Sequence, residues 1–193
     1  RYGFSLHTPT YYELHEEYWS SMSTNFIHDD QYFYSESYLG VFDYELNTPF
    51  KIINSLSFII NQKGIISLDY EYLNYSMANI NSDFYNFIDV NNDIENYYTS
   101  TSNIKIGCEL RIHNQLSLRG GYAYYGSPYV GEYNNASREY LTMGIGLQIN
   151  QYFIDMAVIN SISNEDLFIY DNASNTAINT IKSQLLVSTG LKF

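Results

Sequence analysis

The stretch that decides the fold is residues 139–158, EYLTMGIGLQINQYFIDMAV. Its first half, 141–149, places an apolar side chain at every second position and a glycine, threonine or glutamine between them. After a two-residue link at 150–151 the alternation resumes over 152–158. Period two is the repeat of a β-strand, and two such runs joined by a short link predict a tight β-hairpin.

The same alternation recurs through the chain. It predicts nine strands, at 1–8, 34–46, 50–60, 66–72, 104–112, 116–124, 141–149, 152–158 and 184–193. The linkers are short near residues 62, 114 and 150, and long and polar at about 78–101, 127–138 and 162–180. Short turns at one rim and long loops at the other are typical of bacterial transmembrane barrels. The sequence therefore predicts an all-β, antiparallel transmembrane β-barrel with about nine strands in this chain.

The two faces of the predicted strands differ in chemistry. One is apolar, while the other carries Gly, Ser and Ala with charges of both signs: Asp43, Glu45, Lys51, Asp69, Glu71, Lys105, Glu109, Arg111, Arg119 and Asp155. A Lys or Arg facing lipid at mid-bilayer costs about 2 to 4 kcal/mol, so the apolar face is assigned to lipid. The lumen is then expected to hold a structural charge network of Asp69, Glu71, Lys105, Glu109, Arg111, Arg119 and Asp155. Pairing among these charges is favoured over a catalytic role for the carboxylates.

Composition supports a membrane boundary and excludes several function classes. The chain has 22 Tyr and 11 Phe, an excess that suits aromatic girdles at the membrane surface. No apolar run approaches the ~20 residues of a transmembrane helix. The net charge of -12 disfavours a nucleic-acid partner. The single cysteine, Cys108, rules out an internal disulfide and is read as a small apolar side chain.

Several passages resemble one known family. LSLRGGYAYYGSPYV at 116–130, the hairpin at 139–158, IISLDYEYLNYS at 65–76 and the opening RYGFSLHTPTYYEL are similar, in family order, to the FadL/TodX family of outer-membrane transporters for fatty acids and other hydrophobic compounds. Together they extend over nearly the whole chain. Phe193, after the last alternating run, resembles the terminal aromatic residue that barrel-assembly machinery reads.

The resemblance implies a place and a task. Family members form a barrel of about fourteen strands with an N-terminal hatch, so residues 1–193 are expected to be the C-terminal portion of one barrel domain, without the hatch and early strands. An odd strand count favours a fragment, with another chain or segment supplying the missing strands. The implied function is passive transport of hydrophobic molecules, such as long-chain fatty acids or aromatic compounds, across the outer membrane of a Gram-negative bacterium. The implied partners are outer-membrane lipid, lipopolysaccharide and a hydrophobic ligand, with no cofactor and no enzymatic activity. The alternative is a structural or interaction barrel within an outer-membrane assembly.

Sharper site hypotheses find less support. His7, His15, His28 and His113 lack metal-ligand spacing, and no nucleophile, base and orienting group converge. The amide-rich outer segments 81–98 and 164–176 could bind divalent cations, but solvated loops are the favoured reading. Apolar residues at 84–88 could capture substrate or simply pack on their neighbours. Residues 9–31 fit poorly, because counting strands back from the C-terminus puts this long link on the short-turn rim, unless Tyr11 to Trp19 forms another strand pair.

Overall fold

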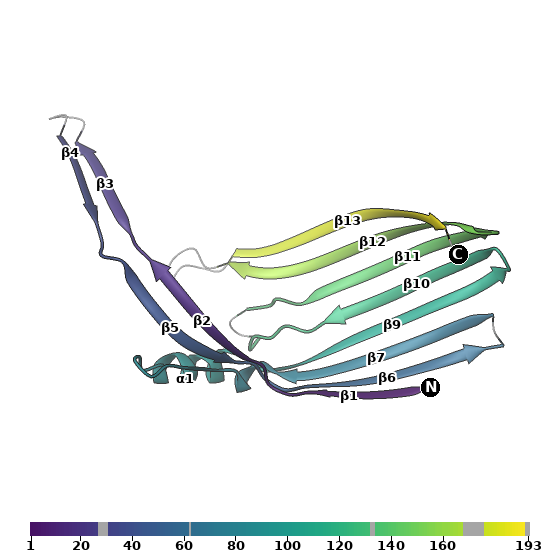
Figure 1. Cartoon of the computed structure of the whole chain (residues 1–193), viewed down its shortest axis with the longest axis horizontal. Helices are drawn as coiled ribbons and strands as arrows, with labels where there is room; N and C mark the ends of the chain where they lie inside the picture. The colour runs from purple at the N-terminus through teal and green to yellow at the C-terminus, as the bar shows by residue number, and fades with distance from the viewer. Residues whose placement is uncertain (27–30, 62, 132–133, 168–175, 192–193) are drawn as a thin grey trace.

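The computed structural model describes residues 1–26, 31–61, 63–131, 134–167 and 176–191. Its regular structure is nearly all β-strand, and the all-β prediction is confirmed. Eight strands form one antiparallel sheet, in the order β1 (Tyr2–His7), β6 (Lys51–Ile60), β7 (Gly64–Asn74), β9 (Ser100–His113), β10 (Leu116–Tyr125), β11 (Arg138–Ile149), β12 (Tyr152–Leu167) and β13 (Thr176–Leu191). Figure 1 shows these strands side by side from the purple N-terminus to the yellow C-terminal strand.

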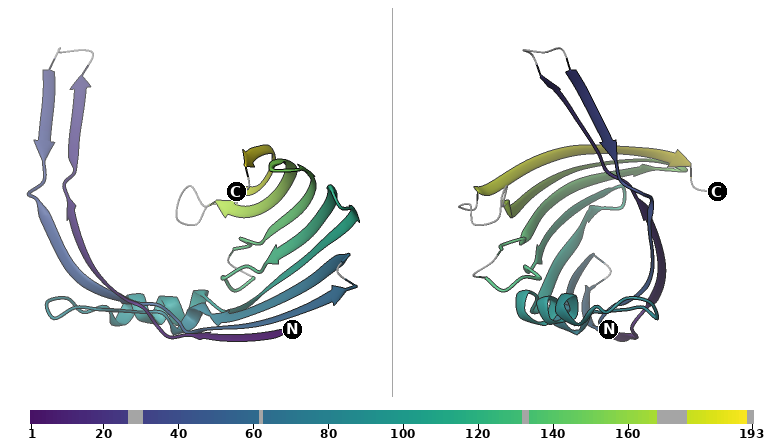
Figure 2. Two further views of the ribbon diagram at one scale, coloured as in Figure 1. Left: turned by 45° about the vertical axis from the view of Figure 1, so that its right-hand side comes forward. Right: turned by 90° about the vertical axis from the view of Figure 1, so that its left-hand side faces the viewer.

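The eight-stranded sheet is a curved, open wall. Figure 2 shows it bent like a trough, with β1 along one edge and β13 along the other. Within the described residues these two edge strands pair only with β6 and β12. The wall therefore has the curvature of a barrel but does not close on itself.

The two faces of the wall differ in exposure as well as chemistry. Along β12 the apolar Ile154, Met156 and Val158 are exposed, whereas Asp155 and Ala157 between them are partly shielded. The concave face of a curved sheet is the shielded one, so the apolar face is convex. No hydrophobic side chain of the described residues is buried. A large uncovered apolar face marks contact with another molecule or with lipid.

The short links gather at one end of the wall. They lie at 61–63, 114–115 and 150–151, while the links at 8–50, 75–99 and 126–137 lie at the opposite end. Asn61 and Asn150 have positive φ values of 41° and 55°. Asparagine tolerates this left-handed backbone, which lets the chain reverse tightly.

The predicted strand at 34–46 does not belong to the wall, and that part of the prediction was wrong. β1 pairs directly with β6. The chain between them leaves the sheet as a long hairpin, in which β2 (Tyr11–Tyr18) pairs with β5 (Gly40–Asn47) and β3 (Ser21–Phe26) pairs with β4 (Gln31–Glu36). The period-two pattern at 34–46 correctly indicated β-strand structure, but alternation does not say which sheet a strand joins.

This hairpin also corrects the orientation of residues 9–31. With eight wall strands, β1 runs toward the long-link end, so the link after it lies there and not at the short-turn rim. Figure 1 shows β3 and β4 reaching far beyond the wall. The suggested strand pair at Tyr11 to Trp19 is seen as β2, whose partner is β5. The odd strand count therefore no longer argues for a fragment.

A second excursion packs beside the base of the hairpin. It comprises η1 (Tyr75–Met77), β8 (Asn79–Asn81), which pairs with β5, and α1 (Ile88–Tyr97). α1 lies in a segment expected to be a loop; the side chain of Asn86 accepts a hydrogen bond from Ile88 N at its start, and Asp89 lies in its first turn. Within the described ranges, no helix has both the length and the apolar character needed to cross a membrane.

Candidate functional site

Three of the predicted lumen charges form one cluster on the shielded face. Arg119 of β10 donates from Nε to Glu109 Oε2 at 2.9 Å and from Nη1 to Asp155 Oδ1 at 2.7 Å. Glu109 is the direct cross-strand partner of Arg119 on β9, whereas Asp155 lies two strands away on β12. One guanidinium thereby links strands on both sides of β11.

Glycine on β11 makes this reach possible. Gly144 lies opposite Arg119, and Gly146 lies opposite Asp155. A Cβ at Gly146 would collide with the Asp155 carboxylate and approach Arg119 Nη1 to 3.2 Å. Because β11 has glycine at both positions, the Arg119 side chain can pass over its backbone and reach β12. The small-residue parity noted in the sequence thus has a specific structural use at this position.

A second cluster lies nearer the long-link end of the same face. Glu71 accepts a hydrogen bond from Asn103 Nδ2 at 2.7 Å and lies 3.6 Å from Lys51 Nζ. Asn103 is only 6% exposed, and its Oδ1 accepts from Gly126 N at 3.2 Å. These contacts tie β6, β7 and β9 to the start of the link after β10. Asn103 was missed from the sequence because its role depends on the β7–β9 register.

The remaining predicted residues are placed as follows. Asp69 and Lys105 face each other in the β7–β9 register, but no ion pair between them is found in the described part of the chain. Lys105 instead lies over the Tyr125 ring, 5.3 Å from its centroid. Arg111 lies 4.0 Å from Glu109 with its side chain more than half exposed. Phe193 lies outside the described residues.

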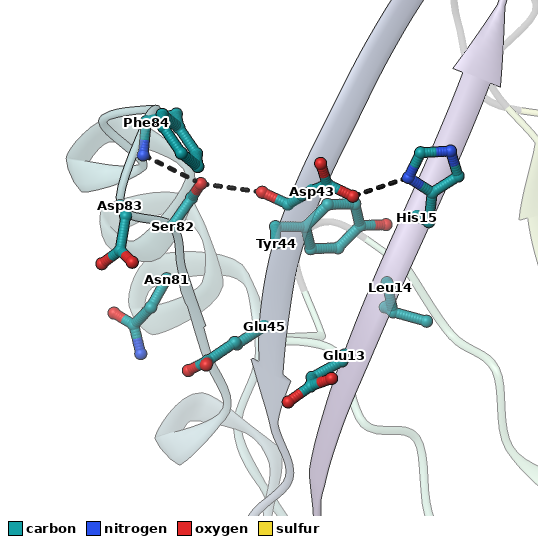
Figure 3. Close-up of a pocket in the computed structure, with 10 residues that line it drawn as sticks. All are labelled: Glu13, Leu14, His15, Asp43, Tyr44, Glu45, Asn81, Ser82, Asp83 and Phe84. Carbon is teal, nitrogen blue, oxygen red and sulfur yellow. Dashed lines mark hydrogen bonds and ion pairs between the residues drawn. The ribbon is translucent and has the colours of Figure 1, made fainter.

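Asp43 and Glu45 do not lie on the concave face of the wall, contrary to the sequence assignment, because β5 belongs to the hairpin formed by β2, β3, β4 and β5, which we call the outer hairpin. There they line a hollow of about 470 Å³ at the hairpin base, shown in Figure 3. Its lining residues are Glu13, Leu14, His15, Asp43, Tyr44, Glu45, Asn81, Ser82, Asp83 and Phe84. The hollow thus combines carboxylates, amide and hydroxyl groups with aromatic rings.

Local hydrogen bonds hold the wall of this hollow in place. His15 Nδ1 and Asp43 Oδ1 are 2.6 Å apart across the β2–β5 pair, and the Ser82 hydroxyl donates to the Asp43 backbone carbonyl at 2.7 Å. Two hydrogen bonds raise the pKa of His15 above its ordinary value of 6.5: the one with Asp43 has the larger effect and the one with Glu17 the smaller. The imidazole is therefore a pH-sensitive cross-strand link outside the wall.

An aromatic cluster fixes the loop before α1 against the other face of the hairpin. Phe42 packs between Tyr18, with ring centroids 5.5 Å apart, and Tyr85, at 4.6 Å. Phe87 completes the row against Tyr44 at 5.9 Å. The apolar residues at 84–88 thus pack partly on their neighbours, although Phe84 itself is 81% exposed.

The described residues give no support to the two alternative site hypotheses, a metal site and catalytic carboxylates. The described residues hold no group of three or more His, Cys, Asp or Glu side chains placed to bind a metal ion. The carboxylates of Glu109 and Asp155 on the concave face are both paired with Arg119.

The curved antiparallel wall, with its convex apolar face and charged concave face, has the architecture of part of an outer-membrane β-barrel. Among solved structures it is similar to the crystal structure of a Pseudomonas aeruginosa FadL homologue, with a TM-score of 0.55 and 13% sequence identity. The match covers 97% of this chain and 47% of that protein, so the chain spans about half its length. At this identity the likeness shows a FadL-like fold and nothing finer. The sequence matches no protein-family profile and no curated protein.

Proposed function

We propose that this chain forms the C-terminal part of an outer-membrane barrel that lets hydrophobic small molecules pass passively through the outer membrane of a Gram-negative bacterium. The observation that carries the proposal is the FadL-like fold over 97% of the chain. The convex apolar face supports it, because a barrel wall meets lipid on that side and water on the other. The proposed cargo is a hydrophobic small molecule such as a long-chain fatty acid or an aromatic compound.

The unpaired edges of β1 and β13 indicate where further strands would complete this barrel. Strand edges left unpaired in a bilayer expose backbone N–H and C=O groups that no water satisfies, at a cost of several kcal/mol each. β13 offers sixteen residues and β1 six along such edges. We propose that further strands, from another segment or chain, pair with β1 and β13 and close the barrel.

The same edges favour a second candidate function, a structural barrel subunit of an outer-membrane assembly. In that case a partner chain would cover β1 and β13, and the lumen would be filled by protein. Native mass spectrometry of the detergent-extracted protein distinguishes the two. A single polypeptide carrying a bound hydrophobic molecule supports the transporter, and a stable complex with other proteins and no ligand supports the assembly subunit.

Transport itself is tested in a Gram-negative host that lacks its own long-chain fatty acid transporter. The full-length protein is expressed and growth is followed with oleate as the only carbon source. The proposal predicts restored growth. Absence of growth, when heat-modifiable gel mobility shows a folded barrel in the outer membrane, contradicts long-chain fatty acids as the cargo.

A further inference from the structure

Apart from its histidines, the outer hairpin carries only acidic charged side chains and has no Lys or Arg. The nine Lys and Arg residues of the chain are Arg1, Lys51, Lys63, Lys105, Arg111, Arg119, Arg138, Lys182 and Lys192. Residues 2–50, which include the whole hairpin, therefore contain none of them. The same stretch contains the acidic residues Glu13, Glu16, Glu17, Asp29, Asp30, Glu36, Asp43 and Glu45. A surface of this kind attracts cations and repels anions.

Most hairpin carboxylates near the hollow have a local partner. His15 contacts Asp43 and Glu17, and the Tyr44 hydroxyl donates to Glu16. Glu13 and Glu45 differ, because they face each other directly across the β2–β5 pair. Like charges directly opposite on neighbouring strands destabilise a sheet. No cation or hydrogen-bond donor meets either carboxylate within the described ranges.

The hollow adds a third carboxylate and an exposed ring to this pair. Asp83, from the loop after β8, also lines it and has no side-chain partner among the described residues. Phe84 follows, with its ring 81% exposed. Figure 3 shows Glu13 on β2, Glu45 on the neighbouring β5, and Asp83 on the loop beside β5, with Phe84 next to Asp83. Three uncompensated carboxylates beside an open aromatic ring are suited to a guanidinium or ammonium group.

The β3–β4 end of the outer hairpin indicates that the partner is larger than a small cation. β3 and β4 form a separate two-stranded sheet and contact no other element extensively within the described residues. Trp19, Met22, Tyr32 and Tyr38 on or beside it are 64%, 73%, 66% and 98% exposed. An isolated two-stranded hairpin is at best marginally stable in water, and its free edges accept an added strand. A small cation would leave this long aromatic surface uncovered.

Charge selects among the possible macromolecular occupants. A second copy of the hairpin would bring the same acidic side chains together, and the phosphates of lipopolysaccharide would be repelled. We propose that the outer hairpin is the docking surface for a basic polypeptide, with a Lys or Arg side chain entering the hollow between Glu13, Glu45 and Asp83. The partner's extended backbone lies along the aromatic hairpin. This inference does not depend on the proposed transport function.

The test measures binding of fluorescein-labelled nona-arginine to the full-length protein in a non-ionic detergent. The variant E13Q/E45Q/D83N removes the three uncompensated charges, and D89N/D93N/E95Q removes three charges from the exposed side of α1 as a matched control. The proposal predicts at least tenfold weaker binding for the first variant and no more than a twofold change for the control. Phe84→Ala is expected to weaken binding roughly threefold, the scale of one exposed cation–π contact.

Several results would overturn the inference. Equal loss in both triple variants would mean diffuse attraction to an acidic protein, with no specific site. Tight Ca²⁺ binding that depends on the same three carboxylates and is not displaced by nona-arginine would assign the hollow to a metal ion. As a second readout, a nona-arginine carrying a photo-crosslinker should label residues 11–47 and 81–84 predominantly, and labelling spread over the wall strands contradicts the docking surface. Heat-modifiable gel mobility establishes that each variant is folded.

Discussion

Arg119 and Asp155 form an ion pair, with Nη1 and Oδ1 2.7 Å apart, although a whole strand lies between the strands that carry them. Ordinary cross-strand pairs join neighbours. This one crosses β11 where the strand has glycine, so it fixes the relative positions of three strands at once.

The glycine at the crossing should be intolerant of even one methyl group. In Gly146→Ala the new Cβ overlaps the Asp155 carboxylate, so either the ion pair or the β11–β12 register must shift. We expect a loss of about 1 to 3 kcal/mol in unfolding free energy, as for an overpacked site. Urea titration of the barrel in lipid vesicles measures it.

Gly120→Ala is the matched control for this substitution. A Cβ there would lie 3.5 Å from Cys108 Sγ, an ordinary contact. Its unfolding free energy should stay within about 0.5 kcal/mol of the parent protein. Equal destabilisation by the two substitutions would show that the crossing has no special requirement for glycine.

The ion pair itself should contribute modestly. The side chains of Arg119 and Asp155 are 47% and 35% exposed, so water screens their attraction. A double-mutant cycle with Arg119→Met and Asp155→Asn should give a coupling energy of about 0.5 to 1 kcal/mol. A coupling of zero would mean that the pair holds no strands together.

A new charge should destabilise the barrel much more on one face of a strand than on the other. Leu68 on β7 lies on the apolar face, and Ser67 before it lies on the polar face. Leu68→Arg should destabilise the barrel in lipid by about 2 to 4 kcal/mol, because a guanidinium at mid-bilayer loses its hydration. Ser67→Arg should cost much less. The reverse order of the two effects would invert the assignment of the faces.

The His15–Asp43 link predicts a pH response confined to the outer hairpin. Because its pKa in the folded chain is raised above 6.5, the stabilisation from protonated His15 is fully present below the unfolded pKa. It is lost as pH rises through the raised folded value. NMR titration of the His15 ring in nanodiscs should give a pKa above 6.5, and Asp43→Asn should lower it. An unchanged pKa in that variant would show that Asp43 is not the cause.

The local alternation of apolar and polar residues was sufficient to predict most strands of the wall. Period-two alternation found both strands of the 139–158 hairpin and the turn at 150–151, because the two faces of each strand differ in polarity. It missed the strand ends: β12 continues to Leu167 and β13 begins at Thr176, so much of the long loop predicted at 162–180 is strand. The same rule failed for 34–46, since Phe42 and Tyr44 alternate equally well in a hairpin that packs on Tyr85 and Phe87. Alternation records that a strand has two unlike faces and not what covers them.

The site residues were also predicted only in part. Charges could be assigned to a face from parity, but which of them meet depends on register. Arg119 reaches Asp155 only because glycine lies between them, and Glu13 faces Glu45 only because β2 pairs with β5. The helix at 88–97 was not predicted, since its Asn-rich sequence has no strong apolar repeat.

The central claim is that the apolar face of the wall meets lipid, and the single cysteine offers a direct test. Cys108 lies on the apolar parity of β9 and is exposed. A nitroxide attached to Cys108 in proteoliposomes should be relaxed strongly by oxygen, which partitions into lipid, and weakly by a water-soluble nickel chelate. A nitroxide at Ser67→Cys in a Cys108→Ser background should show the opposite preference. If the Cys108 label is instead more accessible to the nickel chelate than to oxygen, the apolar face does not lie against lipid and the membrane-barrel account is wrong.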